Sequence, residues 1–458
     1  MKTMFKKLSW ALGLIIIIII GFLIISRSML YNYDVNADHA YDFTATEATI
    51  IPVEISGNSL MLPAYEGVGQ SSFLKVEVEA SLFSHVIRPS LELSGNNGSE
   101  IQYFEHGANG ERYINVSKLI EAGAHEIIFE ENFLSIVDGK TDLIQFENPI
   151  LKDKKILILA PHPDDAEIAS FGLYSEHDDI FIVTVTSGDA GSFMYDEVYS
   201  SDEAKAHYLK KGEVRTWNSL SVPMLGGVPP ENLVNLGFND ARLRGMYRDK
   251  DLIASGVYTE ISDMNTFRKQ NTSYLAKGLE GINNWDSLVG NLVYLIGEIN
   301  PDIIITPSPM LDMHSDHQYT TIAAVEALKK LNKQDGQLLL YTNHQVNFNE
   351  RFPYGEMGSL ISLPPTPKGS NYFRRLYSYS MSIDVQRNKI FALDAMNDLR
   401  LGTDYRFSGR AFQQAFETLW MQLTGKDESY FRRSVRSNEF FFVIEMDDIY
   451  DDKKLDKL

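Results

Sequence analysis

The feature that most constrains this chain is a series of short apolar runs that alternate with amphipathic segments after residue 150. The first run, at residues 155–160, is apolar at every position after its lysine. Such a run is typical of a strand covered on both faces of a parallel sheet. Further strands are expected at residues 180–186, 233–236, 302–306 and 337–342, and helices at 166–176, 204–220, 285–299 and 318–331. This order predicts an α/β domain with a doubly wound, mostly parallel sheet.

The residues before this domain show strand patterns without intervening helices. Residues 73–80 alternate apolar and charged side chains, which is the period of a half-buried strand. Shorter runs lie between turn-forming glycines and asparagines, at residues 50–55, 90–93, 101–104 and 125–129. They predict a β-sandwich-like module of about 100 residues. Such a module could bind sugars or act as a spacer, and its sequence leaves both open.

The N-terminus contains an apolar segment at residues 8–25, in which Ser9 is the one clearly polar side chain. As a helix it would extend about 27 Å, close to the ~30 Å of a bilayer's hydrocarbon core. Lysines precede the segment and aspartates follow it, which predicts an N-terminus on the inside. We therefore expect an uncleaved single-pass transmembrane anchor, with the bulk of the chain on the periplasmic or extracellular side. The expected division is a cytoplasmic tail at residues 1–7, the anchor at 8–26, the β-rich module at 34–150 and the α/β domain at 151–458.

Composition excludes several classes of function. The 42 Lys and Arg residues are outnumbered by 62 Asp and Glu, for a net charge of −20, which disfavours binding to nucleic acid. The chain has no cysteine, so disulfides, thiolate metal sites and cysteine nucleophiles are excluded. Neither a G-x-G-x-x-G loop nor a P-loop follows the first strand. Any metal must therefore be held by histidine and carboxylate.

Two polar clusters follow strands of the predicted sheet, at the edge where α/β proteins bind their ligands. The first, at residues 161–167, contains His162 and Asp165, a spacing that one tight turn can bring to a single ion. The second, at residues 306–317, contributes His314 and His317. Two imidazoles and one carboxylate with an open position are the ligands of a catalytic zinc ion. Zinc activates water and polarises a carbonyl, as amide hydrolysis requires.

Four motifs occur in order along the α/β domain: PHPDDAEI at residues 161–168, TSGDAG at 186–191, LGFND at 236–240 and an HxDH cluster at 314–317. Together, over roughly residues 152–425, they resemble the LmbE/PIG-L family of zinc-dependent N-acetylglucosamine deacetylases, which implies a Rossmann-like fold. Three departures are Ala166, where the family commonly has Glu, Ser315, where Pro is common, and Asn218, where the family's Arg-x-x-Glu helix has Glu three residues after Arg215. None removes a metal ligand.

The resemblance implies a role for each motif residue. His162, Asp165 and His317 match the ligands of Zn²⁺, or of another divalent metal. Asp164 matches the general base, and His314 matches the histidine that assists catalysis. Further residues are candidates for contacts with sugar hydroxyls, although each taken singly is more often structural: Asp189, Arg215, Asp240, Arg242 and His344.

The implied reaction is zinc-dependent hydrolysis of the N-acetyl amide of an N-acetylglucosamine-type sugar in a glycan or glycolipid. The products are acetate and a free amino sugar, and the expected partners are that substrate and the membrane. The alternative is a membrane-anchored, non-catalytic glycan-binding or cell-envelope protein that retains a vestigial metal site. The intact motif residues favour the enzyme, because a retired site has no physical reason to keep a buried pair of acids.

Overall fold

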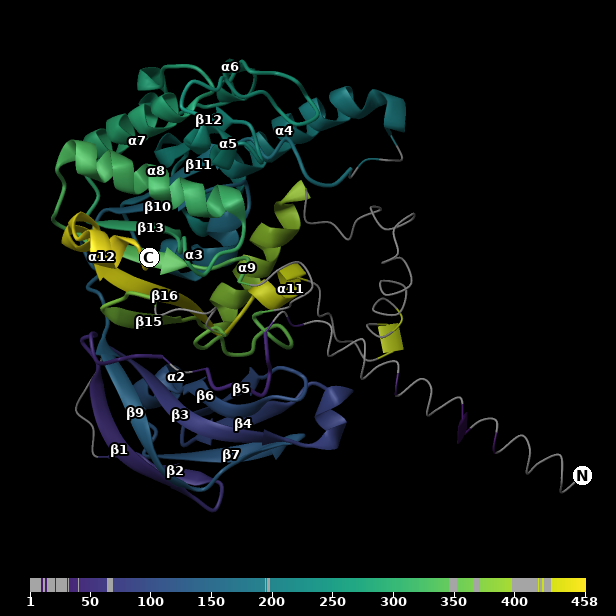
Figure 1. Ribbon diagram of the computed structural model, residues 1–458, viewed down its shortest axis with the longest axis vertical. Coiled ribbons are helices and arrows are strands. Elements are labelled where there is room, and N and C mark those ends of the chain that lie inside the picture. The colour runs from purple at the N-terminus through teal and green to yellow at the C-terminus, as the bar shows by residue number, and fades with distance from the viewer. Residues whose placement is uncertain are drawn as a thin grey trace, which may run out of the picture.

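The computed structural model describes two β-sheets, which lie one above the other in Figure 1. It describes only part of the chain. This part comprises residue 31, residues 33–39, 41–63, 69–193, 195, 198–345, 352–365, 371–397 and 430–458, and the isolated residues Trp10, Gly13, Leu14, Gly21, Leu419, Gln422 and Leu423.

The α/β domain is built on a seven-stranded sheet with the order β12-β11-β10-β13-β14-β16-β15. Five strands are mutually parallel: β10 (Ile156–Ala160), β11 (Ile180–Thr186), β12 (Leu233–Phe238), β13 (Ile303–Pro307) and β14 (Gln337–Tyr341). Of the last two strands, β16 (Asn438–Glu445) is antiparallel to both of its neighbours, β14 and β15 (Arg375–Ser380), so that β15 runs in the same direction as β14.

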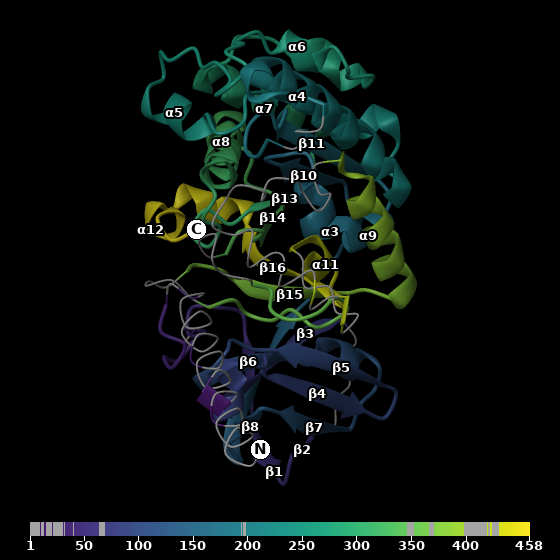
Figure 2. The same ribbon diagram turned by 90° about the vertical axis from the view of Figure 1, so that its right-hand side faces the viewer.

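Helices cover both faces of this sheet, as Figure 2 shows for α8 on one side and α3 and α9 on the other. Leu157 and Leu159 of β10 belong to one buried cluster with α7 and α8, whereas Ile156 and Ile158 belong to a second cluster with α3. The longer helices are α3 (Asp165–Ser175), α4 (Ala204–Ser221), α7 (Trp285–Ile299), α8 (Ser315–Leu331) and α9 (Ile383–Ala395). The α/β prediction is therefore confirmed.

Short helical segments complete the description. The α-helical ones are α2 (Ser117–Glu121), α5 (Leu243–Arg248), α6 (Asn265–Arg268), α11 (Tyr430–Ser434) and α12 (Asp452–Leu455). The 3₁₀ turns are η1 (Leu82–His85), η2 (Ser201–Glu203), η3 (Val222–Gly226), η4 (Pro230–Asn232), η5 (Tyr274–Gly278) and η7 (Met446–Tyr450).

The second sheet belongs to the β-rich module, and all its strand pairs are antiparallel. Val76 and Val78 of β3 are buried and Glu77 and Glu79 are exposed, as the alternating pattern predicts. The strands are β1 (Thr49–Ser56), β2 (Ser59–Met61), β3 (Gln70–Ala80), β4 (Ser90–Gly95), β5 (Gly98–Tyr103), β6 (Asn109–Asn115), β7 (Glu126–Asn132), β8 (Leu134–Ile136) and β9 (Gly139–Glu147).

The predicted strand arrangement needs two corrections. Hydrogen bonds join the strands of the module into one nine-stranded sheet, with β4 and β3 contributing to the same core, instead of two separate sheets. Moreover, the sheets are not mostly parallel, because the module is antiparallel throughout and β16 pairs antiparallel with both β14 and β15 in the α/β sheet. The physical reason is that an apolar run shows burial on both faces but carries no information about strand direction.

The predicted anchor at residues 8–26, and the membrane localisation that depends on it, are also corrected. In the described part of the chain no helix is both long and apolar enough to cross a membrane, which takes about 20 apolar residues. The longest helix in the described part of the chain, α4, has 18 residues and includes the charged residues Lys205, Lys211 and Arg215. Most of residues 8–26 lie outside the described residues. Hydropathy was the basis of the prediction, and hydropathy alone does not establish a spanning helix.

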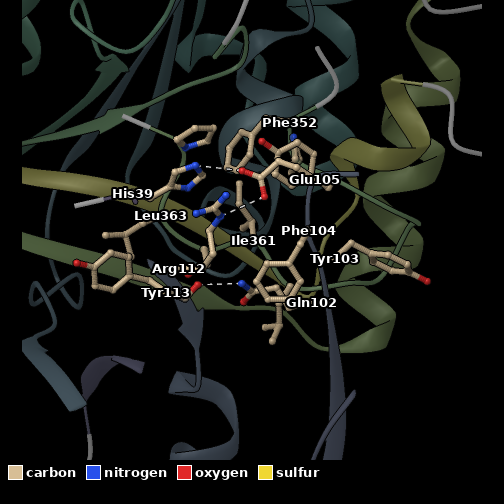
Figure 3. Close-up of a pocket in the computed structure, with 15 residues that line it drawn as sticks. His39, Gln102, Tyr103, Phe104, Glu105, Arg112, Tyr113, Phe352, Ile361 and Leu363 are labelled. Carbon is tan, nitrogen blue, oxygen red and sulfur yellow. Dashed lines mark hydrogen bonds and ion pairs between the residues drawn. The ribbon is translucent and has the colours of Figure 1, made fainter. Parts of the chain in front are cut away.

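Residues 33–39 are attached to the module by a buried charge cluster, shown in Figure 3. A Glu105 carboxylate oxygen lies 3.1 Å from Nε2 of His39, and the other lies 3.3 Å from Nε of Arg112. The Arg112 guanidinium also donates to the main-chain oxygen of Val35 at 2.7 Å. The cluster lines one side of a pocket whose other side is formed by residues 352–365. The Glu105 charge therefore joins parts of the chain that are distant in sequence.

This cluster predicts a specific pH dependence of stability. Burial by itself would raise the pKa of the Glu105 carboxyl, but the charges of His39 and Arg112 lower it from 4.5 to about 2. A depressed pKa stabilises the fold above the unfolded-state value, and this contribution is lost as the pH falls from 4.5 toward 2. We expect Glu105→Gln to lower the free energy of unfolding at pH 7 by on the order of 3 kcal/mol.

Urea unfolding at a series of pH values measures this difference. The gap between wild type and Glu105→Gln should narrow as the pH is lowered below 4.5. Glu77→Gln, at an exposed position of β3, is the control and should change stability little. A gap that stays constant down to pH 2 would contradict the assignment.

Candidate metal centre

The two polar clusters lie at the same edge of the α/β sheet because β10 and β13 are neighbouring parallel strands. The loop after β10 leads into α3 and carries His162, with Asp165 at the first position of the helix. The loop after β13 leads into α8, whose first turn carries His317. Parallel strands end at one edge, so residues about 150 apart in sequence come together.

Three ligand atoms form a compact triangle at this edge. Nδ1 of His162 lies 3.2 Å from Oδ2 of Asp165 and 3.2 Å from Nε2 of His317. The third side, between Oδ2 of Asp165 and Nε2 of His317, measures 3.1 Å. Atoms that bind zinc tetrahedrally at about 2.0–2.1 Å lie roughly 3.3 Å from one another. The donor types and the spacing therefore fit a divalent metal ion.

Asp312 orients the second imidazole of this triangle. Its Oδ2 lies 3.0 Å from Nδ1 of His317, and its Oδ1 accepts the main-chain N–H of His314 at 3.0 Å. A hydrogen on Nδ1 of His317 satisfies the Asp312 carboxylate and leaves the Nε2 lone pair for the triangle. Burial would lower the pKa of His317, but the charges of Asp165 and Asp312 raise it to about 10. A metal ion at Nε2 would replace that proton.

Two further carboxylates lie on the other side of His162. Nε2 of this imidazole is 3.2 Å from Oδ1 of Asp240 and 3.5 Å from Oδ2 of Asp316. The main-chain N–H groups of Ala241 and Leu243 donate to Asp316 at 2.6 and 3.3 Å and hold it in place. Because carboxylates face Nε2, the ring presents Nδ1 to Asp165 and His317, as a metal ligand requires.

The predicted general base, Asp164, is the N-cap residue of α3. Its φ of 133° is strained for a residue with a side chain, and marks the tight turn before α3. Oδ2 of Asp164 accepts a hydrogen bond from Nη2 of Arg215 at 3.0 Å, and the same nitrogen donates to the Pro163 carbonyl at 2.9 Å. Asp164 is thus held by a cation, and is not a member of the triangle.

Two more histidines lie beside the triangle. The ring of His314 is 4.8 Å from that of His162 and 5.0 Å from that of His317, and its buried Nδ1 has no hydrogen-bond partner among the described residues. The ring of His344 is 4.9 Å from that of His317. Burial and the neighbouring histidines lower the pKa of His314 to about 3, so that its imidazole is neutral at pH 7.

The candidate sugar contacts occupy varied positions. Asp189 is fully buried and accepts from the main-chain N–H of Asp240 at 2.9 Å and the Thr259 hydroxyl at 3.1 Å, which ties the loops of this edge together. Nε of Arg242 donates to the carbonyl of Ser255 at 2.7 Å. Arg215 contacts Asp164, and Asp240 contacts His162. These candidate residues therefore contact the loops and side chains around the triangle and are not part of it.

Three residues of the site are not among those predicted from the sequence. Asp312 and Asp316 lie within the second polar cluster. Their closeness in sequence to His314 and His317 is the signal that could have identified them. Asn343 follows β14, the strand beside β13, and its side-chain amide donates to Oδ1 of Asp165 at 2.8 Å. The rule that ligands bind beyond the carboxyl ends of parallel strands could have pointed to Asn343.

Comparisons with known proteins bear on residues 157–328, which match the family model described as PIG-L, GlcNAc-PI de-N-acetylase. No curated protein matches the chain. Among solved structures, a deacetylase triple mutant of the teicoplanin biosynthetic pathway is 15% identical, with 64% of this chain and 99% of that one covered and a TM-score of 0.32. The A40926 pseudoaglycone deacetylase Dbv21 is 15% identical, with coverages of 64% and 98% and a TM-score of 0.33.

The conserved protein TT1542 from Thermus thermophilus is also 15% identical, with coverages of 63% and 94% and a TM-score of 0.29. These likenesses are weak, and the family match stands on the sequence of the matched segment. That segment runs from β10 into α8 and includes all three atoms of the triangle. Residues 157–328 are therefore a domain of the PIG-L family.

Proposed function

We propose that this protein is a zinc-dependent deacetylase that hydrolyses the N-acetyl amide of an N-acetylglucosamine-type sugar in a glycan or glycolipid. The observation that carries the proposal is the triangle of His162 Nδ1, Asp165 Oδ2 and His317 Nε2. The family description of the segment that contains it, a de-N-acetylase of a GlcNAc lipid, supports the reaction and the class of substrate.

In the proposed reaction, His162, Asp165 and His317 hold the ion. A divalent ion bound there would lower the pKa of water and polarise an amide carbonyl. Asp164, oriented by its hydrogen bond from Arg215, takes a proton from the attacking water. A carbon–oxygen bond forms at the acetyl carbonyl, and the carbon–nitrogen bond then breaks. The amine nitrogen takes up a proton, and the products are acetate and the amino sugar.

His314 is suited to assist this reaction as a neutral group. Its ring lies next to two of the ligands, and its Nδ1 has no partner among the described residues. A neutral imidazole can donate a hydrogen bond to the oxygen that becomes negative as the carbonyl is attacked. Because that charge exists only in the transition state, His314 should contribute to the rate of the reaction more than to substrate binding.

The first prediction of this proposal concerns metal content. The purified full chain should hold about one zinc ion, or another divalent ion of similar affinity. His162→Ala and His317→Ala each remove one ligand and should lower metal affinity, with activity partly restored by excess zinc. Elemental analysis after dialysis measures the content, and His125→Ala, at an exposed position outside the site, is the matched control. A metal-free preparation with full amide hydrolysis would refute the proposal.

The second prediction separates catalysis from metal binding. Asp164→Asn keeps the size of the side chain and an oxygen that can accept from Arg215, but removes the base. We expect it to retain the metal and lose turnover by about 10²–10⁴-fold, measured as amine release from N-acetylglucosaminides. His314→Ala should also retain the metal while kcat falls.

The contradicting outcomes of this experiment are distinct. A metal-free Asp164→Asn protein together with a metal-loaded His317→Ala protein would show that the ligand assignment is wrong. A metal-loaded wild-type protein that binds these glycans but releases no amine from them would instead favour the non-catalytic glycan-binding alternative.

A further inference from the structure

Asn343 is buried, and it makes polar contacts in three directions at the edge of the metal centre. Its side-chain Nδ2 donates to Oδ1 of Asp165 at 2.8 Å and to the main-chain oxygen of the same residue at 3.3 Å. Its main-chain N–H donates to Oδ2 of Asp312 at 2.9 Å. Its main-chain oxygen accepts a hydrogen bond from the hydroxyl of Tyr430 at 2.9 Å.

We propose that Asn343 is a positioning residue that sets the geometry of the metal centre, a role that rests on the proposed metal site. The amide occupies Oδ1 of Asp165, which leaves Oδ2 to face His162 and His317. The main-chain N–H of His162 donates to Oδ2 at 2.8 Å and holds the carboxylate from its other end. The Asp165 carboxylate is thereby fixed in one rotation, with a single oxygen directed into the triangle.

The main chain of Asn343 supports a second ligand through Asp312. Oδ2 of Asp312 accepts from the N–H of Asn343 and lies 3.0 Å from Nδ1 of His317. One residue on the loop after β14 therefore supports two of the three proposed ligands, one directly and one through a carboxylate. Partners of this kind fix ligand orientation, and their loss typically costs about 10–100-fold in metal affinity.

Substitution of Asn343 can remove its side-chain hydrogen bond to Asp165 and keep its main-chain hydrogen bond to Asp312. Asn343→Leu has nearly the same size and keeps the main-chain bond to Asp312, but it removes the donor to Asp165. Asn343→Asp also keeps the shape, and it places a second carboxylate next to Oδ1 of Asp165, where like charges repel. Both variants therefore test the side-chain hydrogen bond from Asn343 to Asp165, and Asn343→Asp does so without introducing an apolar group.

The experiment measures the dissociation constant for zinc by competition with a chelator, using the full chain. We expect a constant about 10–100-fold higher for Asn343→Leu than for wild type, and a larger increase for Asn343→Asp. The visible spectrum of the Co²⁺-substituted protein should also change, because it reports ligand geometry directly. Neither readout depends on deacetylation.

The matched control is Gln345→Leu. Gln345 is a buried amide two residues further along the same loop, and its Nε2 donates to the carbonyl of Pro365 at 2.8 Å. This variant should bind zinc as wild type does, even though it also loses a buried hydrogen bond. The thermal midpoint of each metal-free variant shows whether it is folded.

The outcomes distinguish this inference from the proposed function. Weaker zinc binding and an altered Co²⁺ spectrum in both Asn343 variants, with Gln345→Leu unchanged, support the inference. Unchanged zinc binding in Asn343→Asp overturns it while the metal site stands, and so does an equal loss of affinity in Gln345→Leu. A wild-type chain that binds neither zinc nor cobalt overturns the metal site and the role of Asn343 with it.

Discussion

A carboxylate can be buried only where cations or hydrogen-bond donors replace the water that it loses, and the candidate metal centre is organised by this constraint. Burial alone would raise the pKa of the Asp165 carboxyl, but His317 and His162 hold it well below its usual range. Glu167, two residues further along α3, accepts a hydrogen bond from Tyr174, and burial raises the pKa of its carboxyl to about 8. Neighbouring acids on one helix thus differ in charge because their partners differ.

The same constraint explains how α3 is held against the sheet. Its backbone departs from helical geometry at Ser170, where φ is −147°. The main-chain N–H groups of Gly172 and Leu173 instead donate to the two carboxylate oxygens of Glu439 at 2.8 and 2.9 Å. Nζ of Lys389 lies 2.8 Å from Glu439, and this pair is almost fully buried. A buried ion pair therefore satisfies the break in the helix that begins at Asp165.

Sequence patterns predicted the parts of this structure that depend on local order. Residues 155–160 identified a central strand, and the motifs around His162 and His317 identified the edge where the ligands meet. No strand was expected at β15 or β16, and the antiparallel direction of β16 depends on its pairing with β14, which an apolar run does not encode. The pattern also did not identify Asn343, because its hydrogen bond to Asp165 depends on the order of β10, β13 and β14 in the sheet, which no single strand encodes.

Hydrogen bonds join residues beside the candidate metal centre to residues that contact the β-rich module. Gln345, two residues after Asn343, is bonded to Pro365, and Leu360 in the same segment donates its N–H to the carbonyl of Ile101 in β5 at 2.7 Å. The module contacts the α/β sheet at β15, whereas the triangle lies beyond β10 and β13 on the far side of β14 and β16. Asn343, which contacts Asp165, and Leu360, which contacts β5, therefore belong to two chain segments that are joined by the hydrogen bond between Gln345 and Pro365.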